Sequence, residues 1–235
     1  MHDLQQEMGL KIVRQGIEDP GKRSRLRDIE EVSDVLENKK GSDAVEGIKL
    51  DLSEFDEFHL NADSFNMMTN LRFLILYIPL GKKSGNVEYP RVFNKFPAKL
   101  RYLEWHGYRL KSLPPTFNAK MVVEIRMPHS HIVELWWGVK DVPNLEGIDL
   151  TECKQLKNLP DLSKATKLRW VNLSGCEKSQ HSATITELET SDENRGNEVN
   201  NRERGAWLKH PFYLGLGLGT FLFAAVVVAK STRGR

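Results

Sequence analysis

The sequence predicts an α/β fold in which a solenoid of short repeats follows a small helical segment and precedes a disordered linker and one C-terminal transmembrane helix. Three observations predict it: a recurring apolar triplet, a polar stretch with almost no core-forming residues, and an uncharged apolar run near the C-terminus. We therefore expect a helical segment over residues 1–44, repeats over 45–176, a linker over 177–211, a transmembrane helix over 212–229 and a basic tail over 230–235.

The N-terminal segment predicts two short helices separated by a turn. Residues 1–15 have the apolar spacing of an amphipathic helix, and no apolar run typical of a secretory signal follows the first methionine. Residues 18–21 are typical of a turn, and residues 28–38 are predicted to form the second helix. The apolar stripe of that helix consists of Val32, Val35 and Leu36.

An apolar triplet with the spacing i, i+3 and i+5 recurs six times. Successive triplets begin 26, 29, 22, 23 and 23 residues apart, a period typical of leucine-rich repeats. In such a repeat the last two members lie on one face of a short strand and pack against the repeats on either side. The triplets are Val45/Ile48/Leu50, Leu71/Leu74/Leu76, Leu100/Leu103/Trp105, Val122/Ile125/Met127, Leu145/Ile148/Leu150 and Leu168/Val171/Leu173.

The residue between the last two members of each triplet should face solvent, because side chains alternate across a strand. These residues are Lys49, Ile75, Glu104, Arg126, Asp149 and Asn172, of which only Ile75 is apolar. We expect a protein partner to contact Glu104, Arg126, Asp149 and Asn172, with Tyr108, Trp136 and Trp137 as candidate aromatic anchors. The alternative is that these aromatic side chains pack between turns of the solenoid.

Two cysteines occupy equivalent positions in adjacent repeats. Cys153 and Cys176 each lie three residues after the last member of a triplet, where leucine-rich repeats place Asn or Cys. We therefore expect a structural role for both, although adjacent repeats would also bring them close enough for oxidation. Neither CxxC nor Cys/His spacing occurs, so we expect no zinc site and a reducing compartment.

The uncharged run begins at Phe212, ends at Ala229 and would span about 27 Å as a helix. It is predicted to cross a membrane, and the alternative is a buried helix packed on the solenoid. Gly215 and Gly219 form a GxxxG motif, a weak indication of helix pairing. These features predict a single-pass membrane protein with cytosolic leucine-rich repeats.

Composition and motifs exclude several classes of function. The formal net charge is +2 with balanced acids and bases, so we expect no nucleic-acid partner. Neither GxSxG nor HExxH occurs, and we expect no enzyme and no metal. His129 and His131 come nearest to a metal pair, but without a third ligand we interpret them as structural.

Short motifs run through residues 1–176: Met1-His2-Asp3-Leu4 with Gln6-Glu7-Met8-Gly9, Pro20-Gly21-Lys22-Arg23-Ser24-Arg25-Leu26, Val45-Glu46-Gly47-Ile48, Leu100-Arg101-Tyr102-Leu103-Glu104-Trp105, Leu110-Lys111-Ser112-Leu113-Pro114 and Pro160-Asp161-Leu162-Ser163. Together they resemble plant intracellular immune receptors of the TIR-NB-ARC-LRR disease-resistance class, from the MHD motif into the first repeats. Arg27 stands where that family often has Trp.

The resemblance implies that His2 corresponds to the MHD histidine, which in the family contacts ADP in an upstream nucleotide-binding domain. The sequence has no GxxxxGK[ST] loop to cradle phosphates, so we expect His2 to be inactive here and no cofactor to bind. The family's NAD-cleaving TIR module has no counterpart in the chain either.

Three interpretations of function follow. In the first, which we favour, the chain is a membrane-tethered protein-interaction module of a truncated disease-resistance protein. Alternatively, it is a fragment of an ADP/ATP-binding switch that works only with upstream NB-ARC and TIR parts, or a non-functional gene remnant.

Overall fold

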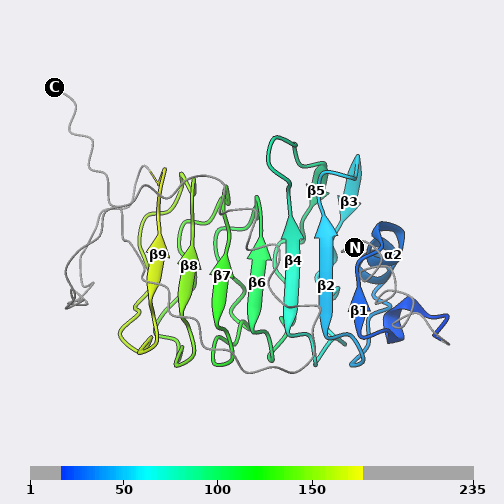
Figure 1. Ribbon diagram of the computed structural model, residues 1–235, viewed down its shortest axis with the longest axis horizontal. Helices are drawn as coiled ribbons and strands as arrows, with labels where there is room; N and C mark the ends of the chain where they lie inside the picture. The colour runs from blue at the N-terminus through cyan, green and yellow to red at the C-terminus, as the bar shows by residue number, and fades with distance from the viewer. Residues whose placement is uncertain (1–16, 177–235) are drawn as a thin grey trace, which may run out of the picture. The chain divides into compact units, whose positions relative to one another are not determined.

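Seven short parallel strands form the main sheet of the protein, with one strand contributed by each turn of the chain (Figure 1). The computed structural model describes residues 17–176. The strand order follows the chain order, so each turn lies beside the next. The strands are β1 (Arg25–Leu26), β2 (Gly47–Asp51), β4 (Phe73–Tyr77), β6 (Tyr102–Trp105), β7 (Glu124–Arg126), β8 (Gly147–Asp149) and β9 (Trp170–Asn172).

The register of these strands confirms the predicted alternation. Ile48 pairs with Leu74, Leu74 pairs with Leu103, and the column continues through the middle members of the three later triplets. Every one of these side chains is buried except Val171 in β9, which is partly buried. The solenoid predicted from the triplets is therefore confirmed.

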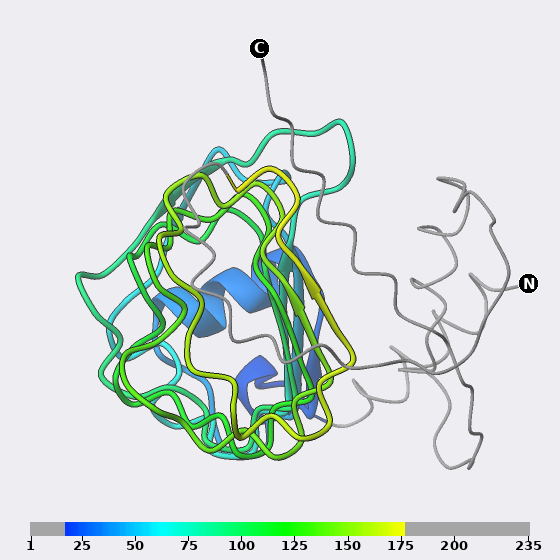
Figure 2. The same cartoon turned by 90° about the vertical axis from the view of Figure 1, so that its left-hand side faces the viewer.

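Viewed along the solenoid, the strands superpose on one side and the return segments close the other (Figure 2). The core between them contains a cluster of aromatic rings around Trp105. Trp105 packs edge-on against Tyr108, with ring centroids 5.0 Å apart, and its indole N–H donates to the hydroxyl of Tyr89 at 2.9 Å. The buried polar N–H is thereby paired within an apolar core.

The first two repeats are longer than the others because each return segment carries an additional strand. Strands β3 (Glu57–His59) and β5 (Asn86–Glu88) pair in parallel and form a separate two-stranded sheet. Each has a single buried apolar residue, Phe58 in β3 and Val87 in β5. The spacings of 26 and 29 residues in the sequence reflect this second sheet.

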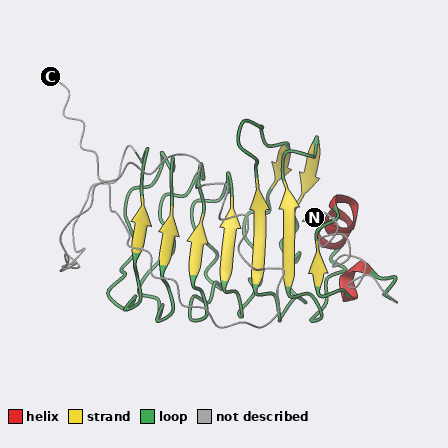
Figure 3. Ribbon diagram, viewed as in Figure 1, coloured by secondary structure: helices red, strands yellow, loops and turns green. Residues whose placement is uncertain are grey.

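A helix covers the N-terminal end of the core (Figure 3). Helix α2 (Ile29–Glu37) begins after Asp28, whose carboxylate accepts the backbone N–H groups of Glu30 and Glu31 at 3.1 and 3.3 Å. The predicted stripe is buried on the core side of this helix: Val32, Val35 and Leu36. A short 3-10 helix, η1 (Pro20–Lys22), precedes β1 at the predicted turn.

The transmembrane part of the predicted fold class and the single-pass membrane localisation require correction. Within residues 17–176 no helix is long and apolar enough to cross a membrane. Helix α2 has nine residues, about 14 Å, against a hydrocarbon core of about 30 Å. The run 212–229 and the pair Gly215 and Gly219 lie outside the described residues, and we retain neither prediction.

Both cysteine thiols connect adjacent turns. The thiol of Cys153 donates to the carbonyl oxygen of Met127 at 3.1 Å, and that of Cys176 donates to Leu150 at 3.0 Å. Both acceptors are the last members of the preceding triplets. Burial raises the pKa of Cys153 to about 12. These contacts support the structural role expected for the cysteines.

Truncation of the buried column should destabilise the solenoid strongly. We expect Leu103→Ala to lower the free energy of unfolding by about 2–5 kcal/mol, because it removes buried methyl groups and leaves a cavity between β4 and β7. The matched control Leu80→Ala changes a fully exposed side chain and should cost less than about 0.5 kcal/mol. Urea denaturation measures both, and equal losses would contradict the assigned core.

The neutral thiol of Cys153 should make stability depend on pH. The unfolded thiol ionises near pH 9.0 and the folded one only near pH 12, so the unfolded chain binds fewer protons in this range and stability falls as pH rises. Relative to Cys153→Ala, the wild type should lose up to about 1.4 kcal/mol per pH unit above pH 9. Urea denaturation of both proteins at several pH values measures this, and a pH-independent difference would disprove it.

Candidate functional site

The solvent-facing side of the main sheet carries two aligned rows of side chains. The outward row consists of the residues between the last two triplet members, and the register pairs them in order across the sheet: Lys49, Ile75, Glu104, Arg126, Asp149 and Asn172. Its charges alternate in sign from Lys49 to Asp149. A second row lies two residues earlier in each strand: Gly47, Phe73, Tyr102, Glu124, Gly147 and Trp170.

Glu104 of β6 is held by hydrogen bonds on both carboxylate oxygens. The hydroxyl of Tyr102 donates to one oxygen at 2.9 Å, and Nε2 of His106 lies 2.9 Å from the other. The backbone N–H of Ile78 donates to Nδ1 of His106 at 3.1 Å, which leaves the imidazole proton on Nε2, facing Glu104. Glu104 is therefore fixed in orientation.

Glu104 is also held in its charged form. Partial burial disfavours the carboxylate, but the hydrogen bonds from His106 and Tyr102 and the nearby Arg126 guanidinium outweigh it and leave the pKa of Glu104 below its ordinary value. The carboxylate is consequently negative at neutral pH, beside the positive Arg126 of the next strand.

Arg126 spans three strands at the C-terminal part of the sheet. It forms an ion pair with Glu124 on its own strand, and its guanidinium lies over the ring of Trp170 with a separation of 5.6 Å. Trp170 reaches it by lying across Gly147 of β8, where a Cβ atom would come 2.2 Å from the indole. The arginine–tryptophan stack therefore depends on glycine at position 147.

The last two residues of the outward row use part of their polarity within the protein. One carboxylate oxygen of Asp149 accepts the backbone N–H and the hydroxyl of Thr151, at 3.0 and 2.5 Å. The amide oxygen of Asn172 accepts the same two groups from Ser174, at 3.1 and 2.8 Å. These contacts end the strands in Asx-turns. Within residues 17–176, the other carboxylate oxygen of Asp149 and the amide nitrogen of Asn172 form no hydrogen bond.

The other sequence-predicted residues are dispersed. Trp136 is 1% exposed and Tyr108 is fully buried. The expectation that these two residues anchor a partner is therefore wrong, and both pack in the core, as the alternative stated. Trp137 is 74% exposed, but it belongs to the return segment between β7 and β8. His2, the residue on which the nucleotide-switch alternative rests, lies outside the described residues.

The segment that carries His129 and His131 is held to the preceding turn through Ser130. Between His129 and His131, both exposed, the buried hydroxyl of Ser130 accepts the backbone N–H of Tyr108 at 3.1 Å. The segment thereby connects the turn after β7 to the turn after β6.

Four further residues complete the outward face and were not predicted from the sequence: Tyr102, His106, Glu124 and Trp170. The signal was available: side chains two residues apart on a strand share a face, so the positions two residues before and two residues after each outward residue lie on the same face of the sheet. The contact between Trp170 and Arg126 has no such signal, because it crosses an intervening strand.

Adding a side chain at position 147 should displace Trp170. We expect Gly147→Ala to shift the indole N–H resonance of Trp170 in NMR spectra, assigned with Trp170→Phe, and to cost about 1 kcal/mol of stability as the stack with Arg126 is lost. Asp141→Ala, at an exposed position in the loop before β8, is the control and should leave the resonance in place. An unshifted resonance in Gly147→Ala would exclude the described packing.

The chain is similar in sequence to plant disease-resistance proteins. No family model matches the sequence. Three Arabidopsis thaliana proteins are similar over 75% of the chain: Disease resistance protein RPS6, 40% identical over 178 residues; Disease resistance protein RML1B, 39% over 178; and Disease resistance protein TAO1, 40% over 180. The matched regions are 16%, 17% and 15% of these relatives, so the chain spans a small part of their length. The chain belongs to the plant disease-resistance protein family.

Proposed function

We propose that the chain acts in plant defence by binding a protein partner through the outward face of its main sheet. The observation that carries this proposal is the arrangement of Arg126 and Trp170 across Gly147. Arginine and tryptophan are the residue types that contribute most to binding energy at protein interfaces. Here they lie together on a face built from rigid, paired strands, beside the charged Glu104.

The outward face is ordered before a partner arrives. Glu104 is fixed by Tyr102 and His106, and Arg126 is fixed by Glu124 and Trp170. Side chains that are already held in one orientation lose less conformational entropy on binding. A partner therefore gains more net affinity from these contacts than it would from mobile surface charges.

The alternating charges suit a protein partner better than a polyanion. Glu104 and Asp149 occupy the strands on either side of Arg126, so a phosphate approaching the guanidinium would meet carboxylates as well. A protein surface with charges of the opposite order can pair with all three positions. Such complementarity contributes chiefly to specificity and association rate.

Proximity labelling in plant leaf cells tests the proposal. We expect the double variant Arg126→Glu/Trp170→Ala to reduce labelling of the partners seen with wild type by at least about tenfold, because hot-spot truncations cost about 2 kcal/mol or more. Lys157→Glu is the control, since it makes the same charge reversal at an exposed position in a return segment. Trp137→Ala examines the exposed tryptophan separately.

Two results would count against the outward face. Equal labelling by wild type and the double variant would remove it as the binding surface. Equal losses in the double variant and in Lys157→Glu would indicate a general charge effect instead. Thermal unfolding of each variant shows whether it remains folded.

A further inference from the structure

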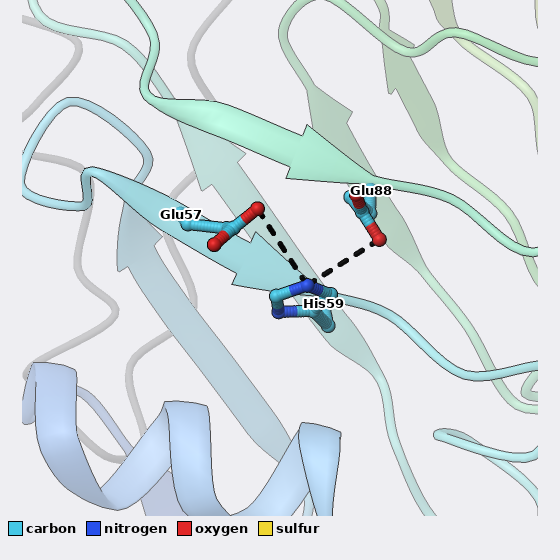
Figure 4. Close-up of side chains that lie close together, drawn as sticks. All are labelled: Glu57, His59 and Glu88. Atoms are coloured by element: carbon cyan, nitrogen blue, oxygen red, sulfur yellow. Dashed lines mark ion pairs between the residues drawn. The ribbon is translucent and has the colours of Figure 1, made fainter.

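The small sheet formed by β3 and β5 brings metal-ligating side chains together (Figure 4). Phe58 and Val87 point into the core, so the residues on either side of them face solvent. Glu57 and His59 are therefore neighbours on the exposed face of β3, and Glu88 lies opposite His59 in the register of β5. The two segments are far apart in the sequence but adjacent in space.

The distances between these side chains suit ligands around an ion. Nε2 of His59 lies 3.3 Å from a carboxylate oxygen of Glu88 and 3.8 Å from one of Glu57, and the ligand atoms of all three residues lie within 4.8 Å of one another. Both separations are longer than an ordinary N–H···O hydrogen bond. Atoms that bind one ion at about 2.0–2.2 Å in a tetrahedron lie about 3.3–3.6 Å apart.

A fourth residue, Glu37, lies on the other side of the imidazole. Glu37, the last residue of α2, accepts the backbone N–H of His59 at 2.9 Å. The same oxygen lies 3.9 Å from Nδ1 of His59. One ring nitrogen thus faces a single carboxylate while the other faces two. In metal sites the ring nitrogen of histidine that does not bind the ion commonly donates to a carboxylate, and Glu37 is the carboxylate on that side of His59.

The charges of the cluster are unbalanced. Three carboxylates surround His59, and among residues 17–176 no lysine or arginine forms an ion pair with Glu37, Glu57 or Glu88. Like charges at this separation repel one another, and a divalent cation between them would remove that repulsion.

We propose that Glu57, His59 and Glu88 bind one divalent transition-metal ion, with Glu37 as a residue that positions His59. One imidazole with two carboxylates suits Zn²⁺ better than Mg²⁺ or Ca²⁺, which prefer oxygen ligands alone. The exposed setting leaves the remaining coordination positions to water. The inference is independent of the proposed protein-binding face, and it revises the expectation of no metal, which rested on motif spacing.

Bound metal would connect the return segments of the first two repeats at the sheet they share. Glu57 and His59 belong to the first of these segments and Glu88 to the second. The ion would hold β3 and β5 together beyond their three register pairs.

Isothermal titration calorimetry of the full chain with ZnCl₂ tests the site. We expect His59→Ala and Glu88→Gln each to lower Zn²⁺ affinity at least tenfold relative to wild type. His129→Ala, which removes an exposed histidine elsewhere, is the matched control and should retain the wild-type affinity. Glu37→Gln should lower the affinity about tenfold or more while preserving the stoichiometry, as loss of an orienting carboxylate does.

Spectroscopy separates ligation from a purely structural effect. Co²⁺ added to wild type should give the visible absorption of a protein-bound ion, and His59→Ala should lose that absorption while its thermal unfolding stays unchanged without metal. No Zn²⁺ binding by wild type at 100 µM metal, or binding that His59→Ala leaves unweakened, would overturn the proposal.

Discussion

No turn of this chain can exclude water from its own apolar side chains, and the rest of the structure depends on that constraint. Each strand contributes two inward residues at most, and each is covered by the equivalent residues of the strands on either side. The parallel register follows, because a shift of one residue would turn the inward residues toward solvent. At the N-terminal end, α2 supplies the covering side chains that a preceding strand would otherwise provide.

The periodic part of the fold was predictable from sequence, and the irregular part was not. The triplets predict six of the seven strands of the main sheet and their inward residues, and Asp28 followed by a spaced apolar stripe predicts α2. Strands β3 and β5 have one buried apolar residue each, too few to show a period. The adjacent Trp136 and Trp137 have opposite exposure. Because return segments have no fixed alternation, the sequence alone cannot tell which of the two is buried.

Site residues could be predicted from the sequence only where their position depends on alternation within a single strand. The outward row is a consequence of alternation within each repeat, so Glu104 and Arg126 could be named in advance. The grouping of Glu57, His59 and Glu88 depends on pairing between two return segments. The spacing of these residues in the sequence does not indicate that pairing. The prediction of a membrane helix over residues 212–229 likewise rested on the length and composition of that run alone.

Trp170 and Gly147 show that neighbouring repeats are not interchangeable parts. The indole belongs to one turn and the space that it fills belongs to the turn before. A graft or recombination event could move the β9 turn next to a repeat that has a side chain at the position equivalent to Gly147. The tryptophan would then be transferred without the space that it occupies. The natural unit of exchange on this face is therefore a pair of consecutive turns, and variation at the two positions should be correlated across the solenoid.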